Sequence, residues 1–91
     1  MQFTFNHTNF NVLDLKRSMD FYQEALGLTE IRRIEKPDFT IVYLGDGVSD
    51  FCLELTWLKD RKEPYNLGEN EFHTAFCVKD MDAALAKHKA M

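Results

Sequence analysis

Apolar and polar side chains alternate along the first part of the chain, from residue 3 to residue 12. Phe10 and Val12 fall on one side of this alternation, and His7, Asn9 and Asn11 fall on the other. A period of two is typical of a strand that has one buried face and one open face. We therefore predict a half-buried strand that ends at Val12.

From residue 15 the spacing of apolar residues becomes that of a helix. Asp14 precedes this stretch as an N-cap residue, and Gly27 follows it as a residue that ends helices. The pattern predicts an α-helix over residues 15–26. Its apolar residues at helical spacing are Leu15, Met19, Tyr22 and Leu26.

Three further strands follow, separated by short turn signals. Lys-Pro-Asp at residues 36–38 and Gly-Asp-Gly at residues 45–47 interrupt runs of β-branched and aromatic residues. The element order is therefore strand, helix and three strands, a βαβββ unit, which a polar loop at residues 59–70 follows. The predicted strands are residues 28–35, 39–45 and 50–57.

An eight-residue sequence occurs twice. Residues 7–14 read HTNFNVLD and residues 73–80 read HTAFCVKD, with five identities. The second copy predicts a strand at residues 72–78 and a helix capped by Asp80, whereas the counterparts of residues 28–57 lie beyond residue 91. We expect an α+β fold in one domain over residues 1–91: one complete βαβββ module (about 1–58), the loop, and the first strand and helix of a second module (71–91).

Composition narrows the class of partner. The net charge of −4 disfavours nucleic acid and anionic membranes, and no apolar run approaches the ~20 residues of a membrane span. The two cysteines, Cys52 and Cys77, do not form a disulfide framework and are best interpreted as small buried apolar residues. We expect a cytoplasmic protein with a small-molecule partner.

Strand alternation also selects candidate metal ligands. It places the Glu54 side chain on the opposite face of its strand from Leu53 and Leu55. It also turns His7 and His73 away from the helix-covered side. Two imidazoles and a carboxylate are a suitable ligand set for a divalent metal. Separately, each residue also fits an ordinary surface or hydrogen-bonded role. We predict that the three side chains face one concave cavity, within one chain or across a dimer; Asn11, Cys52, Thr56 and Cys77 share these faces as candidate substrate contacts.

Three stretches carry a family resemblance. HTNFNVLDLKRSMDFYQEALGL, LELTW and YNLGENEFHTAF resemble the glyoxalase I (lactoylglutathione lyase) branch of the vicinal-oxygen-chelate superfamily, whose members pair βαβββ modules around a divalent metal. The resemblance implies that His7, Glu54 and His73 are three of four metal ligands. It places the fourth, a glutamate that also transfers the proton, sixty-six positions after Glu54 and beyond residue 91. No catalytic residue is therefore assigned, and the resemblance implies a C-terminally truncated member.

The resemblance implies a lyase that isomerises the hemithioacetal of a 2-oxoaldehyde such as methylglyoxal, and so serves in its detoxification. The metal expected is Ni²⁺ or Zn²⁺, ahead of Fe²⁺ or Mn²⁺. Asn11 and Leu58 stand where many glutathione-using members have an arginine and a polar residue, respectively. The identity of the thiol co-substrate therefore stays open. Alternatives are an extradiol-dioxygenase-like Fe(II) enzyme and a non-catalytic small-molecule-binding module.

The incomplete second module also predicts association. Its strand has an open edge, and its helix has an apolar stripe formed by Met81, Ala84 and Leu85. We expect either a symmetric homodimer through this part of the chain or disorder after about Asn70.

Overall fold

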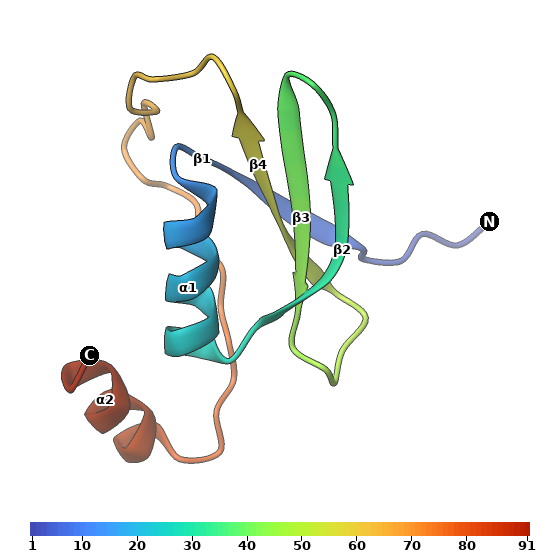
Figure 1. The fold of residues 1–91 in the computed structure, drawn as a ribbon. Helices are drawn as coiled ribbons and strands as arrows, with labels where there is room; N and C mark the ends of the chain where they lie inside the picture. Colours follow the sequence, from blue (N-terminus) through green and yellow to red (C-terminus); the bar gives the residue numbers. More distant parts are fainter.

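The computed structural model describes all 91 residues and contains the predicted βαβββ unit (Figure 1). One four-stranded sheet has the order β1-β4-β3-β2, in which β1 is parallel to β4 and the other pairs are antiparallel. The helix α1 packs on one face of this sheet, and α2 lies beside the C-terminal end of α1. The elements are β1 (His7–Val12), α1 (Leu15–Leu26), β2 (Thr29–Glu35), β3 (Phe39–Gly45), β4 (Cys52–Leu58) and α2 (Met81–Lys89).

Both ends of α1 form as the sequence predicts. The Asp14 carboxylate accepts a hydrogen bond from the Arg17 amide at 3.0 Å, which satisfies one of the free amides of the first turn. At the other end Gly27 adopts φ 70°, and its amide donates to Gln23 O at 2.9 Å. A residue with a Cβ is strained at this φ, so glycine ends the helix here.

The core lies between α1 and the sheet. Seven residues are buried, and all of them fall between residues 25 and 55. Val42 and Leu55, on neighbouring central strands, are 0% exposed. The side chains that close the core from β1 and α1 are Phe10, Val12, Leu15, Met19, Tyr22 and Leu26. The predicted inward faces of the first strand and helix are therefore confirmed.

Two strand predictions need correction. The first strand begins at His7 rather than near residue 3, and Phe3 and Phe5 before it are exposed. More importantly, residues 72–78 form no strand. A β-strand needs hydrogen-bonding neighbours, and the sheet of the first module offers this segment none. The helix after Asp80 forms as predicted.

The second copy of the repeat does not join the sheet (orange in Figure 1). Thr74 and Cys77 help to line a cavity of about 270 Å³ together with Leu28, Leu44 and Leu53, which are core residues on the α1 side. The predicted alternation of inward and outward side chains in this segment was therefore wrong, because no sheet holds it. At the end of the chain, a ring nitrogen of His88 lies 2.6 Å from Ala25 O and connects α2 to α1.

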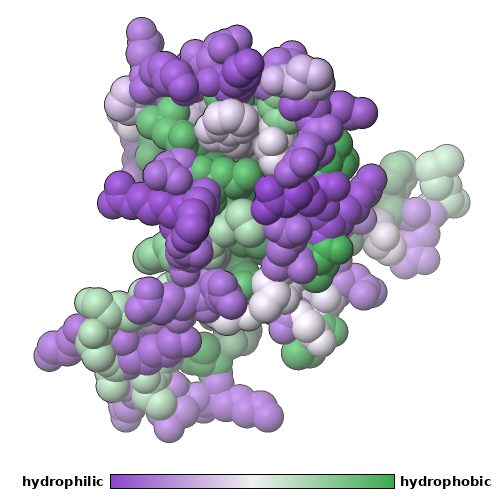
Figure 2. Space-filling model, viewed as in Figure 1, coloured by the Kyte–Doolittle hydropathy of each residue, from purple (hydrophilic) through white to green (hydrophobic).

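The surface of α2 has both apolar and polar side chains. Met81 and Leu85 on α2 are 63% and 59% exposed, as the predicted apolar stripe requires. Figure 2 shows pale green and purple residues side by side over this helix, at the lower left of the view. Neither α1 nor α2 has the length and apolar character that a membrane-crossing helix requires.

Candidate metal and substrate site

The helix-free face of the sheet brings together two of the three predicted metal ligands. His7 on β1 and Glu54 on the adjacent β4 both point away from α1, because their neighbours Thr8 and Leu55 face the helix. His7 Nε2 lies 3.4 Å from Glu54 Oε2, and the two side chains are 37% and 12% exposed. The site is thus partly shielded yet open on the histidine side.

The orientation of the His7 ring favours cation binding. Its Nδ1 lies 2.6 Å from Asn6 Oδ1, an acceptor, which favours the tautomer that has the proton on Nδ1. In the neutral ring the lone pair of Nε2 then faces the Glu54 carboxylate. Two electron-pair donors facing one another need either a proton or a metal cation between them.

The spacing of the two donor atoms fits one metal cation. Nitrogen and oxygen ligands of zinc lie about 2.0–2.2 Å from the metal, so two of them are about 2.9 Å apart at a right angle and about 3.4 Å apart at a tetrahedral angle. The 3.4 Å between His7 Nε2 and Glu54 Oε2 falls within this range. His7 and Glu54 are therefore suitable to hold a divalent cation.

Two residues that the sequence did not single out support this pair. Tyr43 lies directly across from Glu54 on β3, and its ring meets the His7 ring edge-on at 5.6 Å between centroids. A hydrogen bond to the Glu54 carboxylate raises the pKa of the Tyr43 hydroxyl above its usual value. Asn9 lies across from Glu54 on the other side and, with its amide nitrogen turned toward β4, donates to Glu54 Oε1 at 2.8 Å.

These contacts follow from the strand pairing. In the sequence, Asn9 already falls on the polar side of the first strand. Tyr43 and Ile41 are two residues apart on β3, so their side chains point to the same face of the sheet. What the sequence did not contain was the register, which brings Asn9, Glu54 and Tyr43 into one cross-strand row. Outer partners of this kind orient metal ligands.

The predicted substrate contacts divide between the two faces. Cys52 and Thr56 lie on the helix-free face with Glu54, and Thr56 Oγ1 is 2.6 Å from the Asn9 side chain. Asn11 also lies there, and its side-chain Oδ1 is 2.8 Å from the Asn9 side chain. Cys77 lines the cavity on the α1 side, so within one chain Cys52 and Cys77 do not line the same cavity.

His73 does not join His7 and Glu54 within one chain. It is exposed in the irregular segment before α2, and no group of three or more His, Cys, Asp or Glu residues is close enough to hold a metal. The reason is again the missing sheet partner of residues 72–78. Within one chain, the structure therefore brings together two of the three predicted ligands.

Comparison with known proteins relates this architecture to a family. Residues 4–91 match the sequence profile described as Glyoxalase/Bleomycin resistance protein/Dioxygenase superfamily. A lactoylglutathione lyase of Neisseria meningitidis is 38% identical over 87 residues, which are 91% of this chain and 62% of that protein. The lactoylglutathione lyase of Haemophilus influenzae is 40% identical over 83 residues, or 85% of this chain and 59% of that protein. This chain thus spans about three fifths of these relatives.

A solved structure matches almost the whole chain. The trypanothione-dependent glyoxalase I of Leishmania major has 32% identity and a TM-score of 0.85, and the match covers 98% of this chain and 66% of that one. The match therefore includes nearly all of residues 59–91, with the second copy of the repeat and α2.

Proposed function

We infer the function from one premise: this chain belongs to the Glyoxalase/Bleomycin resistance protein/Dioxygenase superfamily. We propose that it acts as a lactoylglutathione lyase-type isomerase. The substrate would be the hemithioacetal of a 2-oxoaldehyde, such as methylglyoxal, and a thiol. The product would be the thioester of a 2-hydroxy acid. The facing donor atoms of His7 and Glu54 at 3.4 Å carry the proposal.

The reaction needs no oxidant. One hydrogen moves from the carbon that bears sulfur to the neighbouring carbonyl carbon, the carbonyl becomes a hydroxyl, and the hemithioacetal hydroxyl becomes the thioester carbonyl. A divalent cation at His7 and Glu54, Ni²⁺ or Zn²⁺, would supply Lewis-acid polarisation of the two vicinal oxygens. The protein's own part is to hold the Glu54 carboxylate, by Asn9 and Tyr43 from either side.

The third ligand, in this proposal, is His73 of a second copy. The absence of any strand in residues 59–91, which leaves the second copy of the repeat outside the sheet, supports pairing of modules between subunits. Each site would then combine His7 and Glu54 of one copy with His73 of the other. The candidate substrate contacts on the same face are Asn11, Cys52 and Thr56.

Metal titration tests the ligand set. We expect His7→Ala and Glu54→Gln to weaken Ni²⁺ and Zn²⁺ binding by more than about 10-fold in isothermal titration calorimetry, since even outer partners of metal ligands are worth that much. His88→Ala is the matched control, because this histidine contacts Ala25 O far from the site. Absence of metal binding by the wild type, or equal binding by Glu54→Gln, would overturn the proposal.

Mixing two variants tests the shared site. His7→Ala and His73→Ala each spoil every site of their own homodimers. In a mixed dimer one site lacks both histidines, and the other has His7 and Glu54 from one copy and His73 from the other. We expect mixing to restore tight metal binding to about half of the sites in mixed dimers. No restoration after subunit exchange would contradict a site that is shared between copies.

A further inference from the structure

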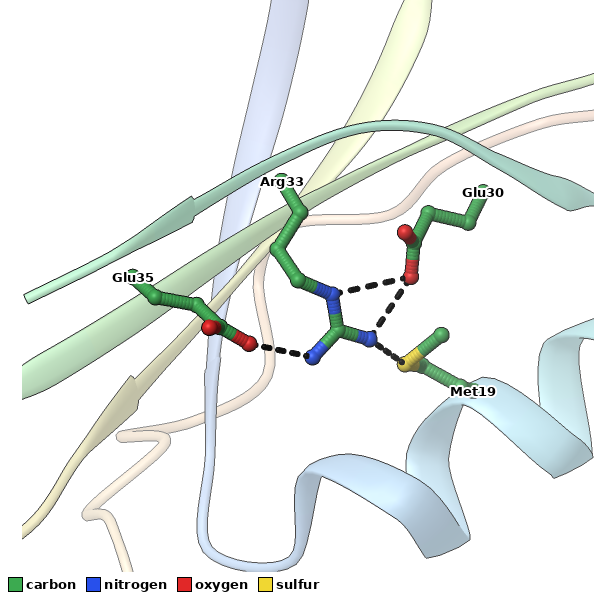
Figure 3. A network of polar contacts seen from close by, with 4 residues as sticks. All are labelled: Met19, Glu30, Arg33 and Glu35. Atoms are coloured by element: carbon green, nitrogen blue, oxygen red, sulfur yellow. Dashed lines mark hydrogen bonds and ion pairs between the residues drawn. The ribbon is translucent and has the colours of Figure 1, made fainter.

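Two cavities lie on the α1 side of the sheet, one toward each end of the helix. The larger, of about 640 Å³, is bordered by Met19 on α1 and by Arg33 on β2, which points to the α1 side, whereas its neighbour Arg32 points to the opposite face. The Arg33 guanidinium donates to Glu30 at 2.6 Å, to Glu35 at 3.3 Å and to Met19 Sδ at 3.6 Å (Figure 3). The guanidinium that borders the larger cavity is thus engaged within the chain, and the smaller cavity is the better candidate for a ligand.

The smaller cavity, of about 270 Å³, lies between the core and the second copy of the repeat. A cross-strand row on β1, β4 and β3, formed by Thr8, Leu53 and Leu44, lines it from the sheet. Leu28, which follows the C-terminal end of α1, joins this row, and the three leucines belong to the buried core. Residues 74–77 of the second copy line the same cavity from outside the sheet. An occupant of this cavity would therefore contact the core and the second copy at once.

The lining of the smaller cavity favours an uncharged ligand. Asp46 is the one charged residue in it, and its carboxylate accepts hydrogen bonds from the Val48 amide at 2.8 Å, the Ser49 amide at 2.7 Å and the Ser49 hydroxyl at 2.8 Å. Asp46 is thus engaged in its own loop, and a second anion in the cavity would have no cationic partner, which is costly. Thr8 and Thr74, which occupy the same position in the two copies of the repeat, each bring a hydroxyl to the lining. A ligand with one hydrogen-bonding group suits this composition.

The size and the aromatic lining define the ligand further. An apolar cavity of about 150 Å³ is large enough for benzene, so this one has room for a substituted ring. Phe51 and Phe76 also line it, and aromatic side chains pack favourably against another ring. We propose that the cavity binds a small uncharged aromatic compound with one hydrogen-bonding group, such as a phenol, and that the bound ring holds residues 74–77 against the core. His7 and Glu54 lie on the other face of the sheet, so this inference is independent of the proposed function.

Two probes of similar size and different charge test the proposal. Isothermal titration calorimetry of the full chain compares 4-methylphenol with 4-methylbenzoate, which carries an anionic carboxylate in place of the hydroxyl. We expect one 4-methylphenol per chain, bound at least about 10-fold more tightly than 4-methylbenzoate because an unpaired charge is costly to bury. Ala75→Leu, which fills part of the cavity, should weaken 4-methylphenol binding by about 10-fold or more through overpacking. Hydrogen-exchange mass spectrometry should show slower amide exchange in residues 74–77 when 4-methylphenol is bound.

Ala83→Leu is the matched control, since it makes the same substitution at an exposed position of α2 that does not line the cavity. It should bind 4-methylphenol as tightly as the wild type does. Absence of 4-methylphenol binding by the wild type, or equal affinities for the two probes, would overturn the inference. Binding that Ala75→Leu leaves at the wild-type affinity would place the ligand elsewhere on the molecule and overturn it as well.

Discussion

Residues 7–14 and 73–80 share five of eight residues, and they differ in what surrounds them. The first copy is β1, paired in parallel with β4; the second is an irregular segment with no strand partner. Their final residues behave alike. Asp14 has φ −130° and ψ 98°, Asp80 has φ −131° and ψ 99°, and each carboxylate accepts from the amide three residues later at 3.0 Å.

The difference separates local from non-local structure. A helix cap involves groups three residues apart in one segment, so the same residues form the same cap in both copies. A strand forms only when another segment supplies hydrogen bonds along its edge. The first copy has β4 as this neighbour, while Phe76 and Val78 of the second remain 46% and 51% exposed. The second copy therefore has the side-chain pattern of a strand but no neighbouring strand to pair with.

The largest expected contrast concerns stability. Leu55 is 0% exposed, so Leu55→Ala should lower the free energy of unfolding by about 3 kcal/mol through lost burial and a cavity. Phe76→Ala, in the second copy, should cost less than about 0.5 kcal/mol in dilute protein, as expected for an exposed position. Urea denaturation followed by circular dichroism at two protein concentrations measures both. A loss of several kcal/mol in dilute Phe76→Ala would show that this segment is already packed in the monomer.

Association is the next contrast. The exposed apolar residues after residue 70 should pair two copies, and Phe76→Asp should raise the dimer dissociation constant by more than 10-fold, about 1.4 kcal/mol. Phe21→Asp is the control, because Phe21 is also a half-exposed phenylalanine, 54% exposed, but lies on α1. Light scattering after size-exclusion chromatography gives the masses. A wild type that stays at 10.7 kDa at about 100 μM, a concentration at which stable dimers form, would contradict the expectation.

The smallest contrast concerns the two caps. Asp14→Ala should destabilise the folded domain by about 1 kcal/mol, the usual cost of losing an N-cap, because α1 covers the core. Asp80→Ala loses an equal hydrogen bond but should leave the unfolding midpoint of dilute protein unchanged and only speed amide exchange in α2. Hydrogen-exchange mass spectrometry together with urea denaturation separates the local effect from the global one. Equal shifts in midpoint for the two variants would mean that α2 unfolds together with the core.

Much of the first module could be predicted from the sequence, because its signals are short-range. The period of two before Val12, the cap at Asp14 and the glycine after Leu26 each depend on neighbours in the chain. The outward facing of His7 and Glu54 followed from the same alternation. Tyr43 and Asn9 were missed because their roles depend on register, and register is decided by how β1, β3 and β4 align rather than by any one of them.

The sequence by itself determined the local elements and the residue types of a metal site: strand, helix, caps, and two histidines with a glutamate. Tertiary structure decided which of them meet. It brought His7 to within 3.4 Å of Glu54, turned Arg32 and Arg33 to opposite faces, and left His73 outside the sheet. The physical reason is that caps and periodicity are satisfied within a few residues, whereas a strand edge or a ligand set is complete only when distant segments, or a second copy, supply the missing groups.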